Sequence, residues 1–199
     1  MDTSKVYAKN VMRRKLIEMD PKALHNISYG IYIICSKNNN KINGQIANAL
    51  FQVTSYPQTI AVSINKNNLT HEYIENSKLF TISILSEETP MKFIGNFGFK
   101  SGKDFDKFKD VNYKLSNENV PIVLDYSTSF IDLKVIDKID IFTHTIFIGE
   151  VKDAEVLSDK KVMTYSYYHE CKGGTSPKNA PTYDKFLDKK INYKEEKNG

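Results

Sequence analysis

The sequence predicts a mainly β protein, a β-barrel with short helices, and three observations support this fold class. Several segments of strand length are rich in β-branched and aromatic residues, and some alternate between apolar and polar side chains. Short helical segments with Gly or Pro near their ends separate them. The chain also lacks the regular βαβ alternation and the GxGxxG fingerprint of a Rossmann domain. At 199 residues it fits one domain with extensions.

The first half of the domain is expected to consist of strands joined by polar turns. Residues 1–20 read as a charged, partly helical extension, and the domain itself is expected to span residues 21–184. The segment SYGIYIICS predicts a strand, and the polar stretch KNNNKING, with a turn at Asn43-Gly44, predicts a hairpin into QIANALFQVTS. TIAVSIN is the next strand, THEYIENS a short helix capped by Thr70, and KLFTISILS a strand again.

The second half continues this pattern. EETPMKFIGNFG reads as a helix that Gly95 and Gly98 end, and SGKDFDKF as a loop that enters another short helix. SFIDLKVIDKIDI alternates, so that the face carrying Asp132 is expected to be wet. HTIFIGEVKDAEVLS is its partner strand, with Gly149 at a bulge or a close approach. The remaining chain loses periodicity, and residues 185–199 are expected to form a tail.

Charge, hydropathy and cysteine content exclude several classes of protein. The 28 basic and 24 acidic side chains give a net charge of +4 without a basic block, so we expect no nucleic-acid partner. No apolar run approaches the roughly 20 residues of a membrane span, and the charged N-terminus does not resemble a secretory signal. Two cysteines far apart in sequence fit a reducing cytoplasm better than a disulfide scaffold, and they are too few for a four-cysteine metal site.

One polar stretch predicts an anion site. In INKNNLTHE a strand breaks into Asn65, Lys66, Asn67 and Asn68, and a helix then starts near Thr70. A helix start offers free N–H groups and the positive end of its dipole, and a phosphate is a natural ligand there. The alternative is a solvated turn with a threonine N-cap, which spacing alone favours because Asn and Lys are common in loops.

Other polar residues give weaker signals. Gln45, Asn48, Gln52 and Thr54 occur among apolar residues, and buried amides need partners, which either a planar heterocycle or neighbouring backbone would supply. The four histidines show no metal-ligand spacing, so no metal site is expected. No Ser/His/Asp or Cys/His arrangement indicates a nucleophile. His144 lies at the start of a buried-looking strand and is the histidine to follow.

Several separated motifs occur in the order found in one family. They are NGQIANALFQVTS, TIAVSINKNNLTHEYIENS, KLFTISILSEETPMKFIGNFGFKSGKDFDKF, HTIFIGEV and TYSYYHECKGGTSPKNAPTY. Together they cover about residues 20–184 and strongly resemble the flavin reductase-like family of FMN-binding split-barrel flavoproteins, which includes flavoredoxin. The set is most similar to the NADH:FMN oxidoreductase-type flavin module of high-molecular-weight rubredoxins.

The resemblance implies a split-barrel homodimer that holds FMN near the dimer interface and takes electrons from NADH or NADPH. The residues that it places around the FMN are Gln45, Ile46, Ala47 and Asn48 at the ring edge, Gln52, Val53, Thr54 and Ser55 along the ribityl chain, Asn65, Lys66, Asn67, Asn68, Leu69 and Thr70 around the phosphate, and Phe97 and Ser101 over the flavin or the nicotinamide approach. His144 matches a family histidine near the flavin. No catalytic acid or base is expected, because the hydride passes to the flavin itself. Many relatives carry a hydroxyl residue where this chain has Ile46, so contacts there are expected through backbone.

The function that the resemblance implies is an NAD(P)H-dependent flavin reductase. Its electrons are expected to pass to free flavin, to oxygen or to a redox partner such as a rubredoxin or a flavodiiron protein, because the chain carries no paired CxxC motifs for an iron site of its own. Two alternatives stay open. One is a flavoredoxin-like electron carrier that a protein donor reduces, and the other is a split-barrel module for a different ligand such as heme.

Overall fold

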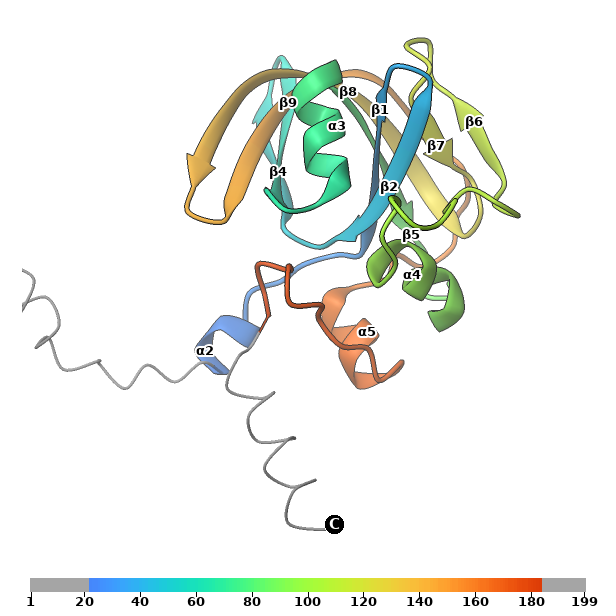
Figure 1. The fold of residues 1–199 in the computed structure, drawn as a ribbon. Helices are drawn as coiled ribbons and strands as arrows, with labels where there is room; N and C mark the ends of the chain where they lie inside the picture. Colours follow the sequence, from blue (N-terminus) through green and yellow to red (C-terminus); the bar gives the residue numbers. More distant parts are fainter. Residues whose placement is uncertain (1–21, 184–199) are drawn as a thin grey trace, which may run out of the picture.

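A seven-stranded antiparallel sheet organises residues 22–183, which are the residues that this computed structural model describes. The strand order is β2-β1-β5-β8-β9-β4-β3, and β6 and β7 form a separate two-stranded sheet (Figure 1). The strands are β1 (Tyr32–Asn38), β2 (Lys41–Ala47), β3 (Leu50–Ser55), β4 (Gln58–Asn65), β5 (Leu79–Leu85), β6 (Tyr113–Leu115), β7 (Pro121–Val123), β8 (Ser127–Ile141) and β9 (His144–Val156). The helices are α2 (Lys22–His25), α3 (Leu69–Ser77), α4 (Met91–Gly98) and α5 (Tyr165–Glu170). The expected extension, 1–20, and tail, 185–199, lie outside the described residues.

The large sheet curls into a barrel that is not closed, because β2 and β3 remain its two edges. Helix α3 lies over the barrel, and α4 and α5 lie together at one end of it (Figure 1). The prediction of a mainly β barrel with short helices is confirmed. A cavity lies beside this open edge at β2.

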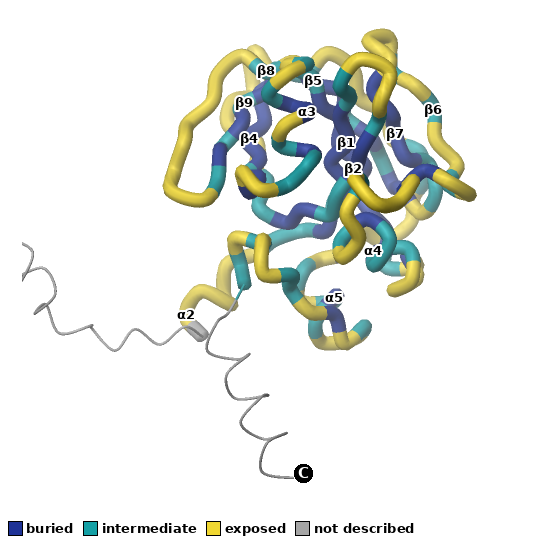
Figure 2. The backbone as a smooth tube through the Cα atoms, in the orientation of Figure 1, coloured by how far each residue is buried: buried dark blue, intermediate teal, exposed yellow. Residues whose placement is uncertain are grey.

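Apolar side chains cover both faces of strand β1, which lies between β2 and β5. Ile34 belongs to a cluster inside the barrel that contains Phe80 of β5 and Ile74 of α3. Ile33, on the opposite face, belongs to a second cluster that includes Phe97 of α4. Because successive residues of a strand point to opposite faces, burial on both sides explains the nearly continuous apolar run in β1. Figure 2 shows this burial along β1 and, by contrast, the exposed outer end of the β8–β9 hairpin.

The first hairpin turns earlier than the sequence predicts. Its turn contains Asn39, whose φ of 53° lies in the left-handed region that asparagine tolerates. Asn43 and Gly44 instead lie within β2, where Gly44 is opposite Cys35. A Cβ on Gly44 would approach Cys35 Sγ to 3.0 Å and the Phe97 ring to 3.1 Å. The glycine therefore allows close packing of the strand and does not form the turn.

Three helix predictions are wrong in detail. Helix α3 starts before Thr70, with Asn68 at the N-cap position, so the threonine is not the cap. The Thr70 hydroxyl instead accepts a hydrogen bond from Asn43 Nδ2 at 2.8 Å. The segment 101–108 forms turns and no helix. Gly95 lies inside α4 and does not end it.

Asp132 is buried, although the alternating pattern of β8 predicts a wet face. Only 4% of it is exposed. It lies opposite Thr81 of β5 in the sheet, and Thr81 donates a hydrogen bond to the Pro121 carbonyl of β7 at 2.5 Å. The small β6–β7 sheet thus covers this face of β8, which sequence alternation alone does not reveal. Burial raises the pKa of the Asp132 carboxyl.

Cys35 is buried, Cys171 is exposed, and both are free thiols. None of the helices in residues 22–183 combines the length and apolar character that a membrane crossing requires.

The predicted close approach at Gly149 of β9 is confirmed. A Cβ at this position would lie 2.7 Å from Cε1 of the fully buried Phe80 and 2.9 Å from Cβ of Leu133. Both distances are shorter than van der Waals contact, so any side chain would push against the filled barrel interior.

We expect Gly149→Ala to lower the free energy of unfolding by about 1–3 kcal/mol, the usual cost of overpacking a core. Gly95→Ala is the matched control, because a Cβ there meets nothing within 4 Å inside α4. The control should be neutral or stabilising by about 0.5–1 kcal/mol, the helix preference of Ala over Gly. Urea denaturation measures both, and equal stabilities for the two variants would contradict the packing argument.

Candidate functional site

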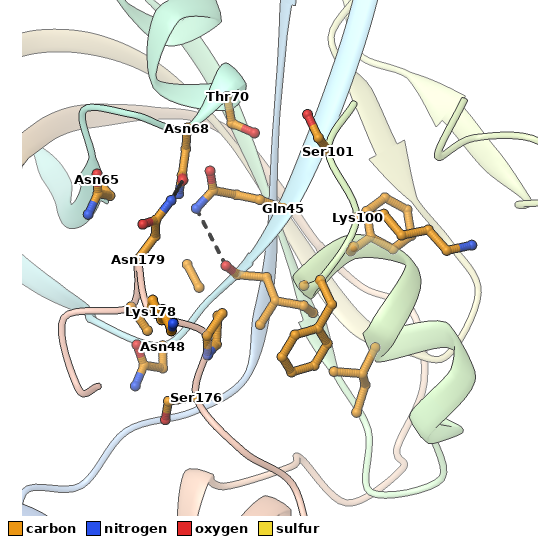
Figure 3. A pocket seen from close by; sticks show the side chains of 18 of the residues that line it. Gln45, Asn48, Asn65, Asn68, Thr70, Lys100, Ser101, Ser176, Lys178 and Asn179 are labelled. Carbon is orange, nitrogen blue, oxygen red and sulfur yellow. Dashed lines mark hydrogen bonds between the residues drawn. The ribbon is translucent and has the colours of Figure 1, made fainter. Parts of the chain in front are cut away.

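A cavity of about 430 Å³ lies where strand β2, the start of α3, the end of α4 and the segment 175–182 meet (Figure 3). Its walls combine apolar side chains such as Phe97 and Ile46 with many amide, hydroxyl and ammonium groups. A volume of this size suits a small organic ligand or cofactor, and a few convergent polar groups in an apolar wall are typical of such sites.

Polar side chains of β2 tie the strand to the rest of the cavity wall. Asn43 donates to Thr70 of α3, as described above, and Gly102 packs directly against the Asn43 amide, leaving no room for a side chain. Asn48, just after β2, donates to Thr182 Oγ1 at 2.9 Å. These contacts hold three segments that are far apart in sequence around one opening.

Among the side-chain amides of β2, that of Gln45 has a buried acceptor oxygen without a hydrogen-bond partner. Its Oε1 is buried and has no hydrogen-bond partner within the described chain, and its Nε2 reaches only the Ile46 carbonyl, at 3.5 Å (Figure 3). An unpaired buried carbonyl oxygen costs about 1–3 kcal/mol. A ligand or an ordered water that donates a hydrogen bond to this oxygen would satisfy it.

The predicted anion site forms the upper part of the cavity in Figure 3. Asn65 Oδ1 accepts from the Asn67 backbone N–H at 3.0 Å, which shapes the turn before α3. Asn68 occupies the N-cap position without a capping side-chain bond. The free N–H groups of the helix start therefore face a site that also receives amide and hydroxyl groups, and this combination suits an anion.

The segment 175–182 closes one side of the cavity, and sequence reasoning did not select its residues as site residues. Asn179 Nδ2 donates to Asn68 Oδ1 at 3.0 Å (Figure 3), and the Asn179 carbonyl lies 3.3 Å from His144 Nε2. Lys178 and Ser176 also line the cavity. The motif TSPKNAPTY was recognised in the sequence, but its lack of periodicity gave no hint of its position.

Lys107 is a second cavity residue that sequence reasoning missed. It is buried, and its Nζ donates to the Gly44 carbonyl of β2 at 2.9 Å and to the Phe97 carbonyl of α4 at 3.1 Å. Burial lowers the pKa of its ammonium to about 8. A lysine in the polar segment SGKDFDKF reads as solvated, and only the fold shows otherwise.

The structure brings most of the predicted site residues together and leaves some apart. Those that line the cavity are Gln45, Ile46, Ala47, Asn48, Asn65, Asn67, Asn68, Leu69, Thr70, Phe97 and Ser101. Gln52, Val53, Thr54 and Ser55 are exposed on β3 and do not line it. Lys66 is exposed and pairs with Asp140 at 3.3 Å. His144 does not line the cavity, but it contacts two residues that do, Asn179 and its sheet partner Asn65. The specific FMN contacts of all these residues remain predictions. No cluster of three or more potential metal ligands occurs in residues 22–183.

Comparison with known proteins gives one consistent result. The family described as flavin reductase like domain matches residues 24–174. Over 165 residues the chain is 52% identical to a high molecular weight rubredoxin of Moorella thermoacetica, covering 83% of this chain and 72% of the relative. It is 47% identical to a ferric-chelate reductase (NAD(P)H) of Archaeoglobus fulgidus, covering 83% of this chain and 98% of the relative.

Solved structures agree in fold. The flavin reductase PheA2 in its native state superposes with a TM-score of 0.61 at 26% identity, over 73% of this chain and 93% of that one. An NADH:FAD oxidoreductase of Streptomyces globisporus C-1027 gives a TM-score of 0.65 at 19% identity, over 71% and 84% of the two chains. The match of the family over most of the chain, together with relatives at about half identity, settles the assignment. The chain belongs to the flavin reductase-like family.

Proposed function

We propose that the protein is an NAD(P)H-dependent flavin reductase that binds FMN in the cavity beside β2. The observation that carries this proposal is the buried, unpartnered Oε1 of Gln45 in a cavity whose other wall is a helix start. An isoalloxazine ring presents an imide N–H that suits such an acceptor, and a phosphate suits the helix start. The residues present therefore fit FMN. The relatives named as ferric-chelate reductase (NAD(P)H) and FMN reductase (NADH) support the reaction class.

The chain divides the binding task between two groups of residues. Gln45 to Asn48 would hold the ring edge, and Asn67, Asn68 and Thr70 would hold the phosphate near the start of α3. FMN, when bound, supplies the chemistry of accepting a hydride from a nicotinamide and passing electrons on. The protein's own residues bind the cofactor, orient it and exclude water, and Phe97 contributes an apolar wall.

The electrons would leave to free flavin, to oxygen or to a separate redox protein such as a rubredoxin or a flavodiiron protein. Support for a protein acceptor comes from the relatives, which include a high molecular weight rubredoxin and several diflavin flavoproteins. Exposed Phe99 and Phe105 lie in the segment beside the cavity, and Lys100 stands 5.1 Å from the Phe105 ring centre. A partly apolar, basic rim of this kind suits brief contact with an acidic partner.

A homodimer is part of this proposal. One chain alone leaves several large apolar side chains exposed, among them Phe51 and Val53 of β3, and Ile139 and Phe142 at the outer end of the β8–β9 hairpin. The strands β3, β4, β9 and β8 are neighbours in the sheet, so these side chains belong to one region. A cluster of this kind favours burial against a second copy. Burial there would also give Gln52 to Ser55 a cofactor to contact at the interface.

The reaction itself is tested by an anaerobic absorbance titration of the FMN-loaded protein with NADH and then with NADPH. We expect one of them to bleach the flavin band rapidly and thereby to identify the donor. A flavin spectrum that neither nucleotide bleaches would instead indicate an electron carrier with a protein donor. A protein that retains no flavin would contradict the proposal as a whole, and a heme spectrum would indicate the other ligand.

The role of Gln45 is tested with Gln45→Met, which keeps the side-chain length and removes the amide. FMN should dissociate on the order of tenfold more readily, because one buried hydrogen bond is lost. The flavin-free protein should keep its stability or gain some, since Oε1 has no partner there. Gln58→Met, at an exposed position of β4, is the matched control. Fluorescence titration and urea denaturation give both quantities, and unchanged FMN affinity in Gln45→Met would remove this contact.

The proposed dimer is tested with Phe51→Glu, which places a charge in the apolar region of β3. We expect the mass from light scattering to fall from that of a dimer to that of a monomer, because a buried carboxylate without a partner opposes association. Leu115→Glu, on β6, carries the same change at a similarly exposed position and should remain dimeric. A monomeric mass for the unchanged protein would refute the dimer and the role of β3 in the site.

A further inference from the structure

Lys107 is a buried cation without an anionic partner. Only 5% of the residue is exposed, and its Nζ contacts two neutral carbonyl oxygens, of Gly44 and Phe97. The ion pairs found among residues 22–183 involve other lysines. Buried charges are normally paired, because transfer of an ion out of water is costly.

No titratable group of the described chain supplies the missing negative charge. The one that faces Lys107 is the thiol of Cys35 on β1, and burial raises the pKa of that thiol to about 12, so it is neutral. From β2 and α4, Lys107 meets only backbone carbonyls. Its own pKa, lowered by burial to about 8, still leaves it charged at neutral pH. The fold therefore maintains an uncompensated positive charge.

That charge acts on the cavity. Lys107 lines it. The two carbonyls accept from two of the three ammonium N–H groups, which leaves the third without an acceptor from this pair. Its partner Gly44 directly precedes Gln45, whose Oε1 is the unpartnered acceptor of the same wall. The wall that would hold the ring edge thus carries a positive potential, whereas the helix start that would hold the phosphate belongs to another element, α3.

We propose that Lys107 makes this cavity bind flavin more tightly in its reduced, anionic state than in its oxidised state. The inference rests on the proposed function. A hydride carries two electrons and one proton, so its transfer leaves the nicotinamide one unit more positive and the flavin one unit more negative. The uncompensated ammonium stabilises that added negative charge, and water excluded from the cavity strengthens the interaction. Lys107 acts here through its charge and not as a proton donor, since no proton needs to leave it.

A purely structural role must be distinguished from this one. Lys107 also connects β2 with α4, so its removal lowers stability whether or not it influences the flavin. The phosphate must be distinguished as well, because FMN carries it in both redox states. The ratio of the affinities for reduced and oxidised FMN separates all three possibilities, since only a charge that senses the ring changes the ratio.

The experiment measures the dissociation constants of oxidised and reduced FMN, the latter anaerobically, for the unchanged protein and for Lys107→Met. We expect Lys107→Met to lose preference for the reduced state on the order of tenfold. Lys109→Met removes the same charge from an exposed position two residues away and should keep the preference. Equal weakening of both states would assign Lys107 to the phosphate, and unchanged affinities would leave it a connection between β2 and α4; either result overturns the proposal.

A pH series on the unchanged protein tests the same point without a variant. Below about 8 the Lys107 ammonium is charged, and above it the flavin-free protein loses that proton. The affinity for reduced FMN should therefore fall as the pH rises through about 8, by at most about tenfold per pH unit because one proton is involved. The affinity for oxidised FMN should stay flat. Parallel pH dependence of the two states would overturn the proposal, and binding of FMN in neither state would overturn the proposed function first.

Discussion

The polar groups in and just after β2 depend on hydrogen bonds that the strand cannot supply, and this constraint shapes the cavity. Asn43 is satisfied by Thr70 of α3, the Gly44 carbonyl by Lys107, and Asn48 by Thr182. Each partner comes from a different part of the chain. The strand is an edge of the open sheet, so its groups would otherwise face solvent or remain unpaired. The segments that satisfy them are the ones that enclose the cavity.

This arrangement explains why elements were easier to predict from the sequence than the contacts between them. The strand KLFTISILS and the helix MKFIGNFG occur where hydrophobic spacing places them, because burial sets both the spacing and the element. The Asn43-Gly44 pair carries a strong turn signal, yet the packing of Cys35 and Phe97 against Gly44 determines its place in β2. At this position tertiary packing overrides the local turn signal.

The same limit applies to the candidate site. The amides of Gln45 and Asn68, which the sequence singled out as candidate cofactor contacts, do line the cavity, since polar groups in an apolar context are visible in a sequence. Lys107 was not visible, because nothing in a polar, Gly-containing segment indicates which lysine is buried. For Asp132 the error is the opposite one: the alternating pattern predicts an exposed residue, but β6 and β7 cover this face of β8. The polar residues of a site can thus be recognised from the sequence, whereas the burial that sets its electrostatics is known only from the fold.

The contacts of the segment 175–182 have a consequence for how the site is held. Asn48 and Asn68, two predicted cofactor contacts, use part of their hydrogen-bonding capacity on Thr182 and Asn179. An amide offers two donor hydrogens and an acceptor with two lone pairs, so each side chain keeps capacity for a ligand while the segment fixes its orientation. Gln45 lacks such a partner and is oriented only by the long contact to Ile46. The cavity therefore combines prearranged amides with one adaptable amide, and the free-energy gain from ligand binding should be largest at Gln45, where an unmet hydrogen bond is made.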